Sequence, residues 1–147
     1  MSHTPAPISS KNRRWFTWRK PAVALLLLFC VLGYVAYTLK ETYLVTSAHT
    51  GVALISGQLE MFAARSKPEP LTLESAVRLL KQDHRDVATD GTQRYNLTRI
   101  GGRFVIFTHV LREGFALRRV VVVHTEERGS EVLPEAEFMA RKKAGNL

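Results

Sequence analysis

The stretch from Ala22 to Leu39 reads AVALLLLFCVLGYVAYTL and holds no charged side chain. At a rise of about 1.5 Å per helical residue it covers roughly 27 Å, close to the thickness of the hydrocarbon core of a bilayer. Apolar residues occupy every face, so the polar stripe of a surface helix is missing. Trp15, Phe16 and Trp18 precede the stretch, where aromatic rings suit the headgroup level. The sequence therefore predicts a transmembrane helix over residues 21–40.

A cleaved signal peptide is the main alternative to a membrane anchor. The leader before the apolar stretch is some twenty residues long, and no Ala-x-Ala site follows the stretch closely. Thr46-Ser47-Ala48 has small residues but lies well beyond its end. Phe29 is too bulky for the residue before a lipidated cysteine, so we interpret Cys30 as a lipid-facing or helix-packing residue.

The charges that flank the apolar stretch predict its orientation. No acid lies among residues 1–20, whereas Lys40 and Glu41 cancel each other after the stretch. The positive-inside rule then makes residues 1–20 a cytoplasmic basic tail and places the rest of the chain on the far side. In a bacterium this predicts a single-pass protein of the inner membrane with a periplasmic or extracellular C-terminal domain. The orientation signal consists of Lys11, Arg13, Arg14, Arg19 and Lys20.

The formal net charge of +8 comes mostly from that tail. The chain has 21 basic and 13 acidic side chains, and residues 41–147 hold 15 of the basic ones and all 13 acidic ones. The region beyond the membrane is therefore nearly neutral, which removes the main reason to expect a nucleic-acid partner. A single cysteine also excludes an intrachain disulfide.

Residues 41–66 predict an amphipathic membrane-proximal helix. Apolar residues recur there at spacings of three and four, and no proline interrupts them. The apolar stripe either packs on the chain's own sheet or pairs with a partner helix in a stalk. Gly51 and Gly57 weaken the helix, and each is a candidate for a bend or a close contact. The candidate partner-helix interface consists of Val45, Ala48, Val52, Ile55, Leu59 and Phe62.

Residues 67–127 predict a small extracytoplasmic α+β domain. The prolines within residues 66–70 favour a linker, and Thr72 is a suitable N-cap for a second helix over residues 73–85. Two strand-like segments then flank the pair Gly101-Gly102, and two glycines permit the positive φ angles of a two-residue hairpin turn. These strands cover residues 93–100 and 103–111, with Leu97 opposite Ile106 and Tyr95 opposite Thr108.

A third strand over residues 115–124 follows a short turn at residues 112–114. Its run from Val120 to Val123 is too apolar for a solvated strand. We therefore expect a three-stranded antiparallel meander packed on the helices, and a polar C-terminal tail over residues 128–147 with a short helix near residues 134–141. The predicted fold class is α+β.

The sequence offers little catalytic chemistry. No pair of the extracytoplasmic histidines has the close spacing of a zinc motif, and no second cysteine exists. A nucleophile elbow and a phosphate-binding glycine loop are also missing from the sequence. We therefore expect a protein that is not an enzyme and uses no metal or cofactor. The histidines concerned are His49, His84, His109 and His124.

Five arginines fall on the predicted sheet and form a candidate basic patch. They either bind an anionic partner or are ordinary solvated charges. Alternation along a strand sends Arg118 and Arg119 to opposite faces, which halves any patch. The five are Arg99, Arg103, Arg112, Arg118 and Arg119.

An anchor, a helical stalk and a small domain without catalytic groups favour a role in protein binding. We expect an anchoring or assembly subunit of a bacterial envelope complex, whose partners are the bilayer, other membrane or periplasmic proteins, or further copies of this chain. The alternative is a ligand-sensing domain that signals through a partner subunit, because the cytoplasmic part carries no output domain.

The layout is similar in outline to two kinds of envelope protein. A long, half-apolar helix followed by a meander is similar to type IV pilins, although Arg19-Lys20-Pro21-Ala22 lacks the glycine of their processing site and no glutamate lies in the apolar segment. A short tail, one span and a periplasmic domain also look like certain inner-membrane subunits of type IV secretion machines. Neither analogy rests on a motif, so neither assigns a family.

Overall fold

The computed structural model describes residues 11–66 and 70–147, with side chains from Lys20 onward. Most of the predicted linker (residues 67–69) and the first ten residues of the predicted tail lie outside the described part. So do the side chains of the orientation signal, except that of Lys20. The chain divides into two compact units, residues 1–37 and 38–147.

The described chain has an α+β fold with three helices and one mixed, six-stranded sheet. Only β1 and β2 pair in parallel, and every other pair of strands is antiparallel. The helices are α1 (Lys11–Arg65), α2 (Leu73–Gln82) and α3 (Glu135–Ala144). The strands are β1 (Val87–Ala88), β2 (Tyr95–Ile100), β3 (Arg103–Thr108), β4 (Leu111–Glu113), β5 (Arg118–Thr125) and β6 (Gly129–Pro134).

The two helices predicted over residues 21–40 and 41–66 form one continuous helix, α1. Lys40 and Glu41 change the polarity of the chain but do not break the helix, because no helix-breaking residue follows until the linker. The apolar stretch and the membrane-proximal stripe therefore share one helical backbone.

Helix α2 begins at the predicted cap. The Thr72 hydroxyl accepts a hydrogen bond from the Ser75 N–H at 3.2 Å, and the Ser75 hydroxyl accepts one from the Thr72 N–H at 3.0 Å. This reciprocal pair satisfies two amides that the first turn leaves free. The helix ends at Gln82, earlier than expected, because His84 adopts a left-handed conformation with φ of 59°.

The β2–β3 hairpin matches the predicted register in full. Leu97 lies opposite Ile106 and Tyr95 lies opposite Thr108. Gly101 and Gly102 both have positive φ angles, 59° and 87°, as the two-residue turn requires.

The three-stranded meander is not confirmed, because the sheet has six strands. The predicted turn at residues 112–114 was wrong: Leu111–Glu113 forms β4, which pairs with the start of β5, and the turn lies at Gly114–Leu117. The Leu117 N–H donates to the Gly114 carbonyl at 3.0 Å to close it.

Strands β3 and β4 pair with successive parts of β5 and are separated by a bulge. Phe107 pairs with Val123 and Leu111 pairs with Val120, so three residues on one side stand opposite Val121 and Val122. This extra residue interrupts the ladder and shifts the alternation of side chains by one position. Leu111 therefore faces the same core as Ile106. The bulge residues are Thr108, His109 and Val110.

The predicted polar tail is part of the sheet. Strand β6 pairs with β5 from Gly129 to Pro134, and α3 follows it. The sequence of β6 shows no clear strand pattern, because Leu133 is the one residue of the strand that is fully buried.

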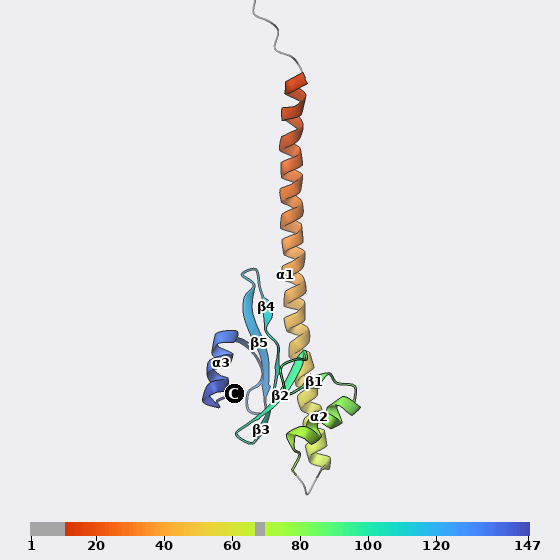
Figure 1. Ribbon diagram of the computed structural model, residues 1–147, viewed down its shortest axis with the longest axis vertical. Coiled ribbons are helices and arrows are strands. Elements are labelled where there is room, and N and C mark those ends of the chain that lie inside the picture. Colours follow the sequence, from red (N-terminus) through yellow and green to blue (C-terminus); the bar gives the residue numbers. More distant parts are fainter. Residues whose placement is uncertain (1–10, 67–69) are drawn as a thin grey trace, which may run out of the picture. The chain divides into compact units, whose positions relative to one another are not determined.

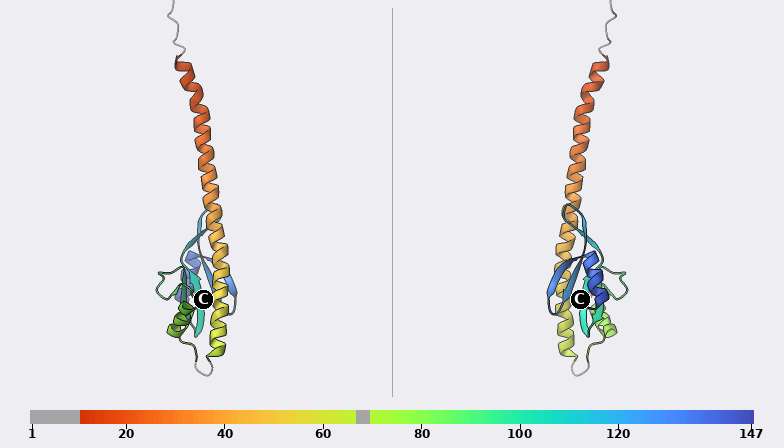
Figure 2. Two further views of the ribbon diagram at one scale, coloured as in Figure 1. Left: turned by 90° about the vertical axis from the view of Figure 1, so that its right-hand side faces the viewer. Right: turned by 90° about the vertical axis from the view of Figure 1, so that its left-hand side faces the viewer.

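Helices cover both faces of the sheet in the folded unit. Figure 1 shows α1 and α2 on one side and α3 on the other, and the side views of Figure 2 bring each side forward in turn. On the first face, residues of α1 and α2 pack with Leu97, Ile106, Leu111, Val120 and Val122. On the second face, Phe138 of α3 packs with Val105, Phe107, Val121, Val123 and Leu133.

Gly51 marks the close contact of α1 with the sheet, whereas Gly57 does not. A methyl group at Gly51 would meet the Tyr95 ring at 2.5 Å from Cζ and 2.9 Å from Cε1, but one at Gly57 would meet nothing within 4 Å.

We expect opposite effects from alanine at these two glycines. Gly57→Ala should stabilise the folded unit by up to about 1 kcal/mol, because alanine favours the helix. Gly51→Ala should destabilise it by about 1–3 kcal/mol, because the Tyr95 ring must move out of a packed position. Thermal unfolding of the two variants in detergent measures the difference. Equal stabilisation by both would show that Tyr95 moves without cost.

The Thr108 hydroxyl repairs the ladder at the bulge. Its Oγ1 accepts a hydrogen bond from the Val122 N–H at 3.1 Å, and Thr108 is only 1% exposed. Thr108→Val keeps the shape but leaves this buried amide without an acceptor, so it should cost about 1–3 kcal/mol. Thr108→Ser retains the hydroxyl and should lose less than half as much in the same unfolding measurement. A serine variant as unstable as the valine variant would contradict the assigned role.

Candidate functional site

The apolar part of α1 exposes its side chains along its whole length. Leu26 and Phe29 are 64% and 63% exposed, and the other large apolar side chains from Val23 to Leu32 are similarly exposed. Within the described residues, one helix is long and apolar enough to cross a membrane. A core helix of a soluble protein would bury such a segment, whereas here almost none of it is buried.

The predicted partner-helix interface lies inside the chain's own core. Ala48 and Val52 are fully buried, and Phe62 packs against the same cluster at its edge. A partner helix could reach these side chains only after displacing the sheet. The structure therefore uses the stripe to hold α1 on the sheet, the first of the two uses that the sequence left open. The other buried members are Val45, Ile55 and Leu59.

The five arginines lie at two ends of the sheet. Arg99 and Arg103 flank the β2–β3 turn, whereas Arg112, Arg118 and Arg119 lie in β4 and β5 at the far end of the β3–β4 line. The structure thus brings together two groups instead of one patch.

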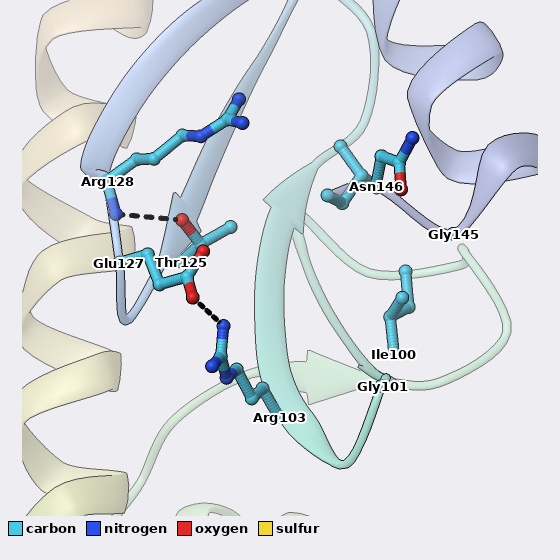
Figure 3. Close-up of a pocket in the computed structure, with 9 residues that line it drawn as sticks. Ile100, Gly101, Arg103, Thr125, Glu127, Arg128, Gly145 and Asn146 are labelled. Atoms are coloured by element: carbon cyan, nitrogen blue, oxygen red, sulfur yellow. Dashed lines mark hydrogen bonds and ion pairs between the residues drawn. The ribbon is translucent and has the colours of Figure 1, made fainter.

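Arg119, Arg99 and Arg103 have the following partners within the chain. Arg119 Nε pairs with Glu135 Oε2 at 2.6 Å, and Arg99 Nε donates to the Gly102 carbonyl at 2.9 Å. Arg103 pairs with Glu127 beside a cavity of about 320 Å³, where the β2–β3 turn, the β5–β6 turn and the last residues meet (Figure 3). Glu127 offsets the charge of Arg103 there, and Arg128 also lines the cavity.

Two of the four histidines meet at Ser130, which the sequence did not reveal. His124 Nδ1 hydrogen-bonds the Ser130 hydroxyl at 2.7 Å, and His49 Nε2 hydrogen-bonds the Ser130 carbonyl at 2.9 Å. His124 lies opposite Ser130 in the β5–β6 ladder, and His49 comes from α1. The contact depends on the pairing of β6 with β5, and the sequence pattern did not predict β6 as a strand. His84 and His109 are exposed elsewhere.

Burial lowers the pKa of His124 below 6.5, the nearby Glu60 carboxylate raises it, and His49 lowers it again. The net direction is downward, so the neutral imidazole is favoured in the fold. Among the described residues, no group of three His, Cys, Asp or Glu side chains could hold a metal ion. The His49 hydrogen bond to Ser130 ties α1 to β6 at the edge of the sheet.

Comparison with protein families, with curated proteins and with solved structures finds no match to this chain.

The folded unit should lose stability as the pH falls through and below 6.5. In that range the unfolded chain binds a proton at His124 before the folded chain does. The free energy of unfolding therefore decreases as the pH falls, until the pH passes the pKa of His124 in the folded state. His124→Gln should flatten this part of the profile of melting temperature against pH. A His124→Gln profile as steep as that of the unchanged protein would contradict this assignment.

Proposed function

We propose that the protein is a single-pass membrane protein whose C-terminal unit binds another protein on the extracytoplasmic side, as an anchoring or assembly subunit of a bacterial envelope complex. The observation that carries the proposal is that the apolar stretch of α1 is mostly exposed, whereas its membrane-proximal part is built into a domain core. The excess of basic residues before the span favours a cytoplasmic N-terminus.

The core also favours an anchor that is retained. Cleavage after Ala48 would remove Val45 and Ala48 from the stripe, two residues that are 5% and 0% exposed. A signal peptidase would therefore remove part of the hydrophobic core, which a secreted domain needs.

The face of α1 opposite the buried stripe supplies a surface for a partner. We call it the outer face; its residues follow spacings of four and three, which place them along one side of the helix. Tyr43 is 71% exposed, and Leu54 and Met61 are each 52% exposed. A groove of about 450 Å³ runs beside it, between Tyr43, Leu54 and Tyr95 of β2. The outer face consists of Tyr43, Ser47, Thr50, Leu54, Gly57 and Met61.

The chemistry of the outer face fits a helix of a second protein anchored in the same membrane. Small residues at Ser47, Thr50 and Gly57 permit close approach, and the three large apolar side chains provide area to bury. Anchoring in one bilayer also raises the effective concentration of the partner, so a modest interface suffices.

Ligand sensing is the second candidate function, because a cavity with a buried polar group lies under α3. Its test is given in the next subsection.

A photo-crosslinking residue at Leu54 should capture a membrane protein partner in living cells. The same residue at Glu126, an exposed position in the β5–β6 turn, is the matched control and should capture none. Met61→Glu should reduce the capture at Leu54 at least fivefold, because a charge must then be desolvated in the interface. Its melting temperature should not change, since Met61 lies on the surface.

Equal capture at Leu54 and Glu126 would contradict the outer face as an interface. Protease added outside the inner membrane tests the topology separately. It should digest the chain beyond residue 40 after denaturation of the domain, and protection of this region would overturn the proposed orientation.

A further inference from the structure

A cavity of about 280 Å³ lies between α3 and the sheet, beside the bulge. Asn96 of β2, His109 of the bulge and Phe138 of α3 are among the residues that line it. Bulges recur next to binding sites because they redirect side chains and end regular pairing. The volume is just below that of pockets for drug-sized molecules, roughly 300 Å³ and above, so it suits a small ligand.

Asn96 brings a buried acceptor without a partner to this cavity. The residue is 1% exposed, and within the described chain its Oδ1 has no hydrogen-bond donor. The Asn96 Nδ2 group donates to the Gln93 carbonyl at 3.0 Å, which fixes the orientation of the amide. Rotating the Asn96 amide by half a turn would place Oδ1 against the Gln93 carbonyl, so that two acceptors would face each other. Oδ1 itself is buried next to the cavity that Asn96 lines, so a donor bound there reaches it once the side chains around Asn96 shift slightly.

The other walls offer an aromatic surface and a positive charge. The rings of Phe107 and Phe138 lie 5.2 Å apart between centroids. The Lys142 ammonium lies 4.7 Å from the first ring and 5.8 Å from the second, and no carboxylate pairs with it among the described residues. Glu135 also lines the cavity, but Arg119 offsets its charge at 2.6 Å. The cavity therefore favours an anion with an apolar body.

We propose that this cavity binds a small organic acid with an aromatic or apolar body. An O–H or N–H group of the ligand donates to Asn96 Oδ1, and its carboxylate meets the Lys142 ammonium. The site does not depend on the proposed membrane anchoring or on the outer face of α1. An acceptor kept buried without a donor destabilises the free protein, a cost that ligand binding recovers.

The test uses the full chain in detergent micelles and 4-hydroxybenzoate as the probe. This acid has an aromatic body, a hydroxyl donor and a carboxylate. Benzoate lacks the donor and phenol lacks the carboxylate, so they are matched controls. We expect 4-hydroxybenzoate to raise the melting temperature, to shift the NMR signals of the Asn96 side-chain amide, and to bind about tenfold more tightly than either control.

Two variants separate binding from folding. Asn96→Val should abolish the preference for 4-hydroxybenzoate over benzoate, while the melting temperature without ligand stays the same or rises. Lys142→Gln should weaken binding of 4-hydroxybenzoate about tenfold, whereas Lys143→Gln, one residue further along α3 and outside the cavity lining, should not. If Asn96→Val does not fold, the Lys142 and Lys143 pair decides the test.

Two outcomes overturn the proposal. One is the absence of both the thermal and the NMR response to millimolar 4-hydroxybenzoate, which would mean that solvent alone serves Asn96. The other is equal binding of 4-hydroxybenzoate, benzoate and phenol, since contact without the donor or the charge is not the proposed site. Neither outcome bears on crosslinking at Leu54.

Discussion

The folded unit depends on burying four consecutive valines, Val120–Val123, on both faces of β5. Side chains alternate along a strand, so Val120 and Val122 need a cover on one face and Val121 and Val123 need one on the other. All four are at most 4% exposed. The second half of α1, together with α2, covers the first face, and α3 covers the second. Each helix turns apolar side chains onto this sheet, so the helices and the sheet form one compact unit from residue 38 onward.

This constraint gives α1 two roles along one continuous backbone. Its apolar stretch is mostly exposed, and its membrane-proximal part puts one stripe into the core and keeps Tyr43, Leu54 and Met61 outside. The buried stripe fixes the rotation of the helix against the sheet, and Gly51 allows the approach of Tyr95. The residues that remain free for a partner are thus determined by the requirements of the core. Under the proposed function, anchoring and binding would share this one helix.

Thr108 and Asn96 are buried polar residues of the sheet whose side chains are satisfied to different degrees. Thr108 uses its hydroxyl to satisfy the Val122 amide where the bulge interrupts the ladder. Asn96 secures its amide nitrogen on Gln93 and leaves its oxygen without a donor in the described chain. The Thr108 hydroxyl replaces a ladder hydrogen bond that is lost at the bulge. The bulge itself lets Ile106 and Leu111 face the same core. The Asn96 oxygen satisfies no other group of the described chain, and Asn96 borders a cavity with aromatic walls and a lysine. Where local requirements for stability are violated, a binding role is the natural explanation.

The sequence by itself determined what depends on local pattern. The apolar run predicted the exposed helix, Thr72 predicted the start of α2, and Gly101-Gly102 fixed the register of Leu97 against Ile106, because a two-residue turn leaves no freedom in the pairing. Tertiary structure decided what depends on contacts between distant segments. It turned the polar segment at Gly129–Pro134 into a strand and brought His49 and His124 to Ser130. A mainly polar edge strand has little pattern of its own, since its partner in the ladder supplies the hydrogen bonds that hold it. The use of the Val45–Leu59 stripe was likewise settled by packing, because an amphipathic helix shows that it needs an apolar neighbour without showing which one.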